Sequence, residues 1–483
     1  MHSASDLLSQ AIALHKAGQL KEAEAVYQTL LAAQPDHAVV LNLLGTLRFQ
    51  QGRWQEGIPL MDKAIAAKPD YAEAHYDRAL ALMKLGEFTE AVTGYDNAIA
   101  IKPDFADAHS NRGNALQELN QYDEALASYE KAIALKPSFA NNYTNQGKAL
   151  HELQRYDEAL VSYDKAIALN PDEPKTYLNK AFLKLLHAKF EEGWELYEWR
   201  WKKHRQDEYT LAHKPLWRGE QSLTGKTILL HAEQGLGDTI QCCRYVRKVQ
   251  ALGAKIILKV PVSLGELMST LQGSFRLVTA EEPVGDFDFH CPLFSLPLAF
   301  KTRLHTIPAD IPYLIADPVR QKMWQERLGK KTKPRIGLVW SGSVANTKDR
   351  NRTIALPLLL PQLQSTYEWH ALQKEIKPQD EALLKRHGQI VLHADSLKDF
   401  ADTAALIAEM DLVLSIDTSV AHLAGALGKP VWILLPFVPD FRWMEGREDS
   451  PWYPSARLFR QTDIGDWKSV IAQMTAALES TYK

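Results

Sequence analysis

A short segment near residue 420 has the residue types of an anion-binding site. An apolar strand is expected to run into Asp417, a natural helix N-cap, and a short helix to continue to Gly428, a natural C-cap. The free backbone amides of Thr418, Ser419 and Val420 would then point out of the positive end of this helix, where a diphosphate is held well. The alternative is that Asp-Thr-Ser caps a helix and binds nothing.

A second segment places a carboxylate after a glycine turn. Gly235 and Gly237 allow a tight loop, which is expected to lift Asp238 to the top of a sheet so that it faces a cleft. This is not the dinucleotide fingerprint, because Ile240 stands where the third glycine is required. The alternative is that Asp238 only caps a helix that begins at Thr239.

Positive charge is concentrated between these two segments. Lys348, Arg350 and Arg352 fall within five positions, close to the small-residue turn Ser341-Gly342-Ser343. Lys348 and Arg352 are the pair predicted to neutralise a leaving diphosphate without a metal ion. Such a charge run is also typical of a solvated loop. Arg442, in a loop after the last predicted strand of this region, is a further candidate.

Strands and helices must hold these segments at the edge of a sheet. Short apolar runs alternate with helical stretches after about residue 206, and a basic connector at 329–334 follows a predicted helix at 319–328. Two consecutive doubly wound α/β domains would leave a ligand cleft at the carboxyl ends of their strands. The expected elements are strands 227–231 and 255–260 around a helix at 238–252, then strands 335–340, 369–373, 390–393, 411–416 and 431–435.

The first 200 residues follow a different pattern, with a period of 34 residues. This period is typical of tetratricopeptide repeats, whose helix pairs stack into a superhelix with a concave binding surface. A sixth unit, 175 to about 208, is rich in aromatic residues and has Arg205 where proline is due, so we expect it to cap the repeats and dock onto the next domain. The periodic prolines are Pro35, Pro69, Pro103, Pro137 and Pro171.

About residues 225–480 resemble the glycosyltransferase family that contains the lipopolysaccharide heptosyltransferases (family 9-like), which has two facing Rossmann-like domains, the GT-B fold. Asp417, Thr418 and His422 match the family's Asp-Thr-x-x-x-His signature, which holds the donor diphosphate. The strand that leads into Ser341-Gly342-Ser343 and the strand end His370-Ala-Leu-Gln373 match as well. The resemblance implies that the nucleotide sugar lies on the C-terminal domain. It also implies that Asp238 is the general base.

Asp286 and Asp288 form the Asp-x-Asp triplet of metal-dependent glycosyltransferases. The resembled family works without this motif, so no metal site and no cofactor other than the nucleotide sugar are expected. His231, His290 and His393 stand at predicted strand ends, and we expect them to be structural.

One position of the repeat reads Leu43, Asp77, Asn111, Asn145 and Asn179. A primary amide both donates and accepts hydrogen bonds, so stacked asparagines on a concave face could hold an extended chain. This is similar to the asparagine ladder of the O-linked N-acetylglucosamine transferase, which also joins a repeat superhelix to a two-domain glycosyltransferase. Asparagine is nevertheless common at this position in tetratricopeptide repeats.

Composition limits the other classes of function. The net charge of −3 and the 24% of charged residues give no general attraction to nucleic acid or to an anionic membrane. The sequence has no stretch of 18 apolar residues and no export signal at its start, so we expect neither a membrane span nor secretion. Three cysteines without a disulfide pattern or metal-ligand spacing fit the cytoplasm.

The sequence thus predicts three domains: a repeat superhelix at 1–208, an acceptor-side Rossmann-like domain at 209–328 and a nucleotide-sugar-binding domain at 329–483. The expected activity is inverting, metal-independent transfer of a sugar to a protein recruited by the repeats. The donor-binding set is Ser341, Gly342, Ser343, Lys348, Arg352, Gln373, Asp417, Thr418, Ser419, His422 and Arg442, with Asp238 as base and Asn111, Asn145 and Asn179 for the acceptor. Two alternatives remain: a catalytically silent scaffold, and a transferase that acts on a glycan.

Overall fold

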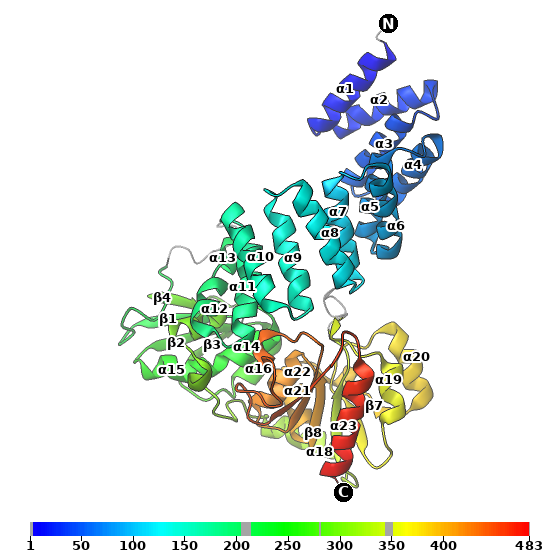
Figure 1. Ribbon diagram of the computed structural model, residues 1–483. Coiled ribbons are helices and arrows are strands. Elements are labelled where there is room, and N and C mark those ends of the chain that lie inside the picture. The colour runs from blue at the N-terminus through cyan, green and yellow to red at the C-terminus, as the bar shows by residue number, and fades with distance from the viewer. Residues whose placement is uncertain (1–2, 204–213, 280–281, 343–350, 483) are drawn as a thin grey trace. The chain divides into compact units, whose positions relative to one another are not determined.

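The computed structural model describes residues 3–203, 214–279, 282–342 and 351–482. The chain forms two compact units, Met1–Thr176 and Tyr177–Lys483. Figure 1 shows the helices of the first unit in blue and cyan, and the sheets of the second unit in green to orange. The three predicted domain bounds stay predictions. The last repeat belongs mainly to the second unit.

Helix pairs of the first unit follow the predicted period. The second helix of each pair ends two residues before a periodic proline, as expected because proline restricts the residue before it to an extended conformation. The helices are α1 (Ala4–Lys16), α2 (Leu20–Ala33), α3 (Ala38–Gln50), α4 (Trp54–Ala67), α5 (Ala72–Leu85), α6 (Phe88–Ile101), α7 (Ala106–Glu118), α8 (Tyr122–Leu135), α9 (Ala140–Glu152) and α10 (Tyr156–Leu169).

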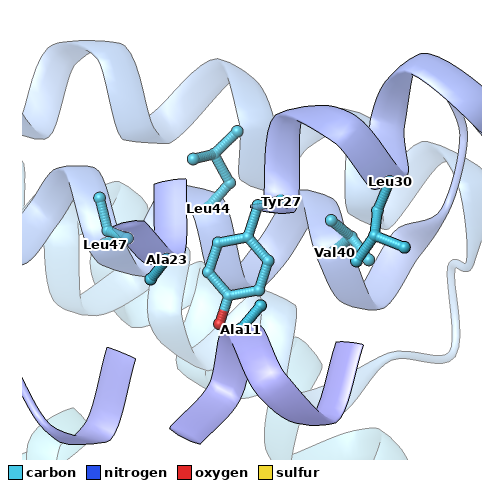
Figure 2. Close-up of a cluster of buried hydrophobic side chains, with 7 residues drawn as sticks. All are labelled: Ala11, Ala23, Tyr27, Leu30, Val40, Leu44 and Leu47. Atoms are coloured by element: carbon cyan, nitrogen blue, oxygen red, sulfur yellow. The ribbon is translucent and has the colours of Figure 1, made fainter. Parts of the chain in front are cut away.

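Small residues let the helices of a pair approach closely. A Cβ atom added to Gly113 would lie 2.6 Å from the ring of Tyr129, and one added to Gly147 would lie 2.6 Å from the ring of Tyr163. Tyr27 is the equivalent residue of the first pair. Figure 2 shows it packed within a buried apolar cluster formed by Ala11, Ala23, Leu30, Val40, Leu44 and Leu47.

The second unit begins within α11 (Pro174–Leu186) and continues with α12 (Phe190–Tyr197) and α13 (Arg200–Lys203). Its first sheet is parallel with the strand order β3-β2-β1-β4. The predicted strands 227–231 and 255–260 are confirmed as β1 and β2. The strands are β1 (Thr227–His231), β2 (Lys255–Val260), β3 (Arg276–Thr279) and β4 (Phe289–Pro292).

The predicted continuous helix at 238–252 is wrong. It is divided into α14 (Leu236–Cys242), a 3-10 turn at Cys243–Tyr245 and α15 (Val246–Ala251). The buried Arg244 explains the break, because its Nε donates to the carbonyl of Gln241 at 2.8 Å and so occupies an acceptor of the helix ladder. Its Nη1 also donates to the carbonyl of Trp452 at 2.7 Å, which ties the first sheet's layer to the second.

The second sheet is also parallel, with the strand order β10-β9-β8-β5-β6-β7. This is the doubly wound order, in which the chain reverses direction across the sheet between β5 and β8. Ligands of such sheets bind at this switch point, outside the carboxyl ends of the strands. The strands are β5 (Arg335–Val339), β6 (Glu368–Ala371), β7 (Ile390–Val391), β8 (Leu412–Ile416), β9 (Val431–Leu435) and β10 (Ala456–Arg460).

Several of these strands end earlier than predicted. β6 stops at Ala371 because Gln373 bends inward, where its Oε1 accepts from the amide of Trp340 at 3.1 Å. The helices of the second unit beside the sheets are α16 (Gly265–Met268), α17 (Leu296–Ala299), α18 (Pro318–Leu328), α19 (Leu356–Leu359), α20 (Pro378–His387), α21 (Phe400–Ala408), α22 (Ser419–Ala426) and α23 (Trp467–Thr481). Within the described ranges, no helix combines the length and the apolar character that crossing a bilayer requires.

Candidate functional site

The loop after β1 carries Asp238 at the third position of α14. The helix begins earlier than predicted, with Gly235 as its N-cap, so Asp238 lies inside the first turn. Its Oδ2 accepts from the amide of Gly235 at 2.8 Å, which closes the turn. Its Oδ1 accepts from the guanidinium of Arg442. Burial raises the pKa of Asp238, and the charge of Arg442 acts against that rise. Asp238 therefore both stabilises a helix start and faces a partner from the other sheet's layer.

The loop after β8 leads directly into α22. The N-cap is Thr418 and not Asp417 as predicted, because Thr418 has the extended backbone that precedes the helix (φ −140°, ψ 171°). Asp417 lies one residue earlier. In the part of the chain that the structure describes, the amides of Thr418, Ser419 and Val420 have no protein acceptor. The three free amides that were predicted therefore lie together at the switch point, and anion binding by them stays a prediction.

Asp417 and His422 form a buried pair behind these amides. Asp417 Oδ1 lies 3.9 Å from His422 Nε2, and His422 Nδ1 lies 2.9 Å from the hydroxyl of Tyr453. Burial raises the pKa of Asp417 to about 6, and the nearby carboxylate of Asp440 adds to the rise. Burial also lowers the pKa of His422 well below its usual value, so its imidazole is neutral at pH 7. This pair adds little negative charge near the amides at mildly acidic pH.

Arg442 lies in a 3-10 turn at Phe441–Trp443, after β9. Besides Asp238, its guanidinium contacts Asp440 Oδ1 at 2.6 Å and Gln241 Oε1 at 2.9 Å. Its guanidinium carbon lies over the Phe441 ring, 4.6 Å from the ring centroid. Because it is held by carboxylates on both sides, Arg442 is oriented by the protein before any ligand arrives. Its contact with Asp238 spans 204 residues of sequence.

Two adjoining cavities meet at the start of α22. The larger, of about 580 Å³, lies between the loop after β1 and the loop after β8 and also reaches the last repeat. We call it the reaction chamber. It is lined by Phe182, Tyr197, Gln234, Gly235, Leu236, Gly237, Asp238, Gly342, Arg352, Asp417, Thr418, Ser419, His422, Asp440, Phe441 and Arg442.

The smaller cavity, of about 300 Å³, lies at the carboxyl ends of β5 and β6, and we call it the inner chamber. It shares Leu236, Gly342, Thr418 and Ser419 with the reaction chamber. Its remaining lining residues are Ser263, Val339, Ser341, Leu372, Gln373, Lys374, Glu375, Leu397, Lys398, Asp399, Phe400, Thr403 and Val420.

The close approach of the two loops depends on Gly237. A Cβ atom there would lie 2.8 Å from His422 Cδ2 and 3.3 Å from the Cα of Ser419. Glycine is therefore required by helix packing, and not only by the turn that the sequence suggested. The packing of α14 against α22 brings Asp238 and the free amides to one cavity.

The remaining predicted donor residues divide into three groups. Ser341 and Gln373 are buried, and Gln373 Nε2 donates a hydrogen bond to Ser341 Oγ at 3.1 Å. Both residues line the inner chamber. Arg352 Nη1 donates to the carbonyl of Asp417 at 2.7 Å and lines the reaction chamber. Ser343 and Lys348 lie outside the described residues.

His370 is buried away from both chambers, where its Nδ1 lies 3.1 Å from His393 Nε2. His231 and His290 form a similar buried pair, with 3.3 Å between Nε2 and Nδ1. Burial, together with the neighbouring His290, lowers the pKa of His231 to about 3.

The two aspartates of the Asp-x-Asp triplet serve structural contacts. Asp286 pairs with Lys214 at 2.8 Å, and Asp288 Oδ2 accepts from the amide of Thr227 at 2.8 Å. Across the described ranges, no group of three or more His, Cys, Asp or Glu side chains is placed to hold a metal ion.

The aromatic part of the reaction chamber was not predicted from the sequence. Phe182 on α11 and Tyr197 on α12 line the chamber, and Phe441 packs against both, with ring centroids 5.8 and 6.2 Å away. The aromatic run of the sixth unit was the available signal. It predicted docking onto the following domain, and Trp194 and Tyr197 do contact Phe294 of the first sheet's layer, with ring centroids 6.0 and 5.4 Å away.

The asparagines of the first unit are already engaged within it. Asn111 Nδ2 donates to the hydroxyl of Tyr76 at 2.8 Å, and Asn145 Nδ2 donates to Asn114 Oδ1 at 2.9 Å. Asn114, which was not among the predicted residues, connects them by donating to Asn111 Oδ1 at 3.2 Å. Asn179 lies on α11, and its buried Nδ2 has no hydrogen-bond partner among the described residues. A role in acceptor binding stays a prediction.

Comparison with known proteins identifies the repeats. Family models described as TPR repeat or tetratricopeptide repeat match residues 8–72, 79–120, 106–139 and 147–185. Protein FlbA of Caulobacter vibrioides is 26% identical over 329 residues, which are 62% of this chain. That alignment spans 54% of FlbA, so the chain matches about half the length of this curated relative.

Solved structures are similar to about a third of the chain. MamA is 27% identical over 33% of this chain and 94% of its own, with a TM-score of 0.32. YrrB, a TPR protein with an unusual peptide-binding site, is 22% identical over 37% of this chain and 92% of its own, with a TM-score of 0.34. The N-terminal part of the chain is thus a tetratricopeptide-repeat region, and parallel α/β sheets come after it.

Proposed function

We propose that the protein is a metal-independent, inverting glycosyltransferase of the cytoplasm. It would move a sugar from a nucleotide-sugar donor to a protein that the repeats recruit. The observation that carries this proposal is the pair of joined chambers at the switch point of the second sheet, with three free amides at their junction and a carboxylate across the larger one. The resemblance to the heptosyltransferase-containing family supports the reaction class.

The inner chamber suits the nucleoside. Aliphatic and aromatic side chains such as Leu372, Leu397 and Phe400 line it, while Gln373 and Lys374 add polar groups that could contact a base or ribose. A nucleoside there would place its diphosphate at the shared residues Thr418 and Ser419. The negative charge would then lie at the amino end of α22.

Positive charge at the junction favours a departing diphosphate. The amides of α22 supply partial charge and Arg352 supplies a full one. Asp417 and Asp440 oppose them, but protonation of Asp417 near pH 6 would reduce that opposition. Arg442 lies on the same chamber and balances Asp440 directly.

Asp238 is placed to act as the base. In a single displacement, the acceptor oxygen forms a bond to the anomeric carbon while the bond to the diphosphate breaks on the opposite face of the sugar. The acceptor proton passes to the Asp238 carboxylate, and the nucleoside diphosphate leaves with the electron pair of the broken bond. Inversion results because attack and departure occur on opposite faces. Arg442 would hold the Asp238 carboxylate in position for this step.

Tetratricopeptide repeats are typical of protein-interaction surfaces, which supports a protein acceptor. In the first unit, the Tyr76–Asn111–Asn114–Asn145 chain of hydrogen bonds leaves the asparagine side chains fixed in place. A bound peptide would then meet groups whose orientation is already set, which lowers the entropic cost of binding.

A single amide tests the donor site. Ser419 is the first residue of α22, a position where proline is tolerated, and Thr418 before it has the extended backbone that proline prefers. Ser419→Pro therefore removes one amide donor and keeps the helix, while Ser419→Ala removes only the hydroxyl. Calorimetry would measure uridine, guanosine, adenosine and thymidine diphosphates in the presence of a chelator.

We expect one of these diphosphates to bind the wild type, and Ser419→Pro to weaken its binding by about 10- to 100-fold, since a charge-assisted hydrogen bond contributes roughly 1.5–3 kcal/mol. Ser419→Ala should bind within about threefold of wild type. The corresponding nucleoside without phosphates should bind all three proteins equally. Absence of binding to all four diphosphates, in a folded sample, would remove the donor site from the proposal.

A further inference from the structure

Phe182 connects the repeat pattern to the reaction chamber. It lies on α11, which opens the sixth repeat, and it lines the same cavity as Asp238 and Arg442. Its ring stacks on Phe441 at 5.8 Å with an interplanar angle of 11° and contacts Tyr197 at 5.7 Å. Tyr197 is 5% exposed, whereas Phe182 is only half-buried, so Phe182 keeps ring surface for a ligand.

Repeat register relates Phe182 to the asparagine positions. Counting back by single periods from Phe182 leads to Lys148, Asn114, Leu80 and Thr46, and of these Asn114 links Asn111 and Asn145 in the first unit. Phe182 also lies one helical turn after Asn179, the last member of the asparagine series. The helix face that carries Asn145 and Lys148 in the preceding repeat thus carries Asn179 and an aromatic ring in the repeat that lines the chamber.

We propose that Phe182 is the residue of the last repeat that contacts a peptide acceptor within the reaction chamber and selects an apolar side chain next to the modified residue. This inference rests on the proposed function for the identity of the acceptor. An aromatic ring is suited to contact an apolar side chain, whereas the neighbouring amide of Asn179 is suited to hold peptide backbone.

The contacts around Phe182 make it a rigid recognition surface. Phe441, on which it stacks, is 3% exposed and precedes Arg442, whose guanidinium carbon lies over the same Phe441 ring. A peptide side chain seated on Phe182 would therefore lie within the chamber that Asp238 faces. Loss of the ring should affect peptide binding and leave the inner chamber unchanged, because Phe182 does not line the inner chamber.

Peptide selection tests this inference directly. A phage-displayed library of random nonapeptides is selected on the full chain, and the strongest binder is synthesised with a fluorescein label. Fluorescence anisotropy then gives its Kd for wild type, Phe182→Ala and Phe182→Tyr. Leu304→Ala is the matched control, because Leu304 is a 41% exposed apolar side chain of the same unit that lines neither chamber.

We expect the selected peptides to share an aliphatic or aromatic residue, and Phe182→Ala to weaken binding about tenfold, the loss typical of one aromatic contact. Phe182→Tyr and Leu304→Ala should stay within about threefold of wild type. Nucleoside diphosphate affinity, measured on the same samples, should be equal in all four proteins. That measurement separates the two proposals, since a failed donor site would leave the Phe182-dependent peptide binding intact.

The inference is overturned if no library peptide binds the wild type, or if Phe182→Ala binds the selected peptide as tightly as the wild type does. Equal losses in Phe182→Ala and Leu304→Ala would overturn it as well, because they would place the peptide outside the chamber.

Discussion

The two units use polar side chains in opposite ways. In the first unit a contact recurs with the period of the sequence: Arg78 pairs with Asp62 and Arg112 pairs with Asp96, both at 2.6 Å. In the second unit, Arg442 joins Asp238 and Gln241, which are 204 and 201 residues away along the chain. A repeated contact has equivalents in neighbouring repeats, whereas a contact made once has none. We therefore expect a substitution in the repeats to change stability near its own position. We expect a substitution at the Arg442 contacts to change the activity of the site.

The largest expected effect is on the chemical step. Asp238→Asn should lower sugar transfer by about 10²–10⁴-fold, the usual cost of removing a positioned base, and should leave diphosphate affinity near that of wild type. Asp440→Asn is the matched control, because Asp440 also pairs with Arg442 and lines the chamber. Asp440→Asn should transfer sugar at a rate within about tenfold of the wild-type rate.

Mass spectrometry of products formed from a panel of nucleotide sugars and cell-lysate proteins measures both variants. Transfer by Asp238→Asn at a rate close to that of wild type would assign the base to another residue and leave Asp238 as part of the turn at Gly235.

A second contrast compares one arginine from each unit. Arg200 is 4% exposed and pairs with Glu198 at 2.5 Å and with Glu233 at 3.2 Å. Burial raises the pKa of Glu233 to about 7, and Arg200 acts against that rise. Arg200→Met would leave these carboxyl groups buried without their cation, so it should lower the free energy of unfolding by about 3–5 kcal/mol. Arg112→Met removes a partly exposed pair, and it should cost less than about 1 kcal/mol.

Denaturation followed by far-UV circular dichroism, which reports the helices of the first unit, and by tryptophan fluorescence separates the two outcomes, because every tryptophan except Trp54 lies in the second unit. Similar losses in the free energy of unfolding from Arg200→Met and Arg112→Met would contradict the contrast between the units.

Two glycines test whether a packing defect stays local. A Cβ atom at Gly425 would lie 2.3 Å from the Tyr453 ring, and one at Gly147 would lie 2.6 Å from the Tyr163 ring. Each alanine substitution should cost about 1–3 kcal/mol through overpacking. Gly425→Ala should also weaken diphosphate binding, because Tyr453 is the hydrogen-bond partner of His422.

Calorimetry on the two glycine variants checks this difference. Gly147→Ala should leave diphosphate affinity unchanged. A matching loss of affinity in Gly147→Ala would show that the repeats and the chamber are coupled more closely than their separate packing suggests.

The smallest effect is a pH dependence. The pKa of Asp417, about 6, is raised above its unfolded value, so the native state is favoured while the carboxyl is protonated and loses stability as pH rises through 6. Asp417→Asn removes the group whose ionisation destabilises the native state. Its melting temperature relative to wild type should therefore be higher in mildly alkaline than in acidic buffer, by a few degrees at most. Differential scanning calorimetry in buffers on either side of this pKa measures the effect, and a difference that is constant with pH would rule out titration of Asp417 in this range.

Some elements could be predicted from the sequence to the residue. β1, β2 and β9 match their predictions because each is a short apolar run with polar or glycine residues at its ends, and burial on both faces requires that pattern. The helix pairs could be predicted for a similar reason, since the packing of Gly147 on Tyr163 repeats with the same period as the residues. Both signals are local in the sequence.

Other features depend on residues that are distant in sequence. Arg244 interrupts a helix because acceptors at Gln241 and Trp452 are available in the folded chain, and a single helical pattern contains no such information. Thr418 and not Asp417 is the N-cap because its extended backbone leads directly into α22, while Asp417 Oδ1 lies 3.9 Å from His422 Nε2. Phe182 lines the reaction chamber because of the way the sixth repeat packs against Phe441.

By itself, the sequence determined the repeat period, the alternation of strands with helices and the glycine turn that leads into α14. These properties result from backbone preferences and from the spacing of apolar residues, which act within about one repeat length. The tertiary structure decided that α14 packs on α22, that Arg442 meets Asp238 and that the last repeat closes the reaction chamber. Each of these requires two surfaces to fit, and shape complementarity between distant segments is not encoded in any local pattern.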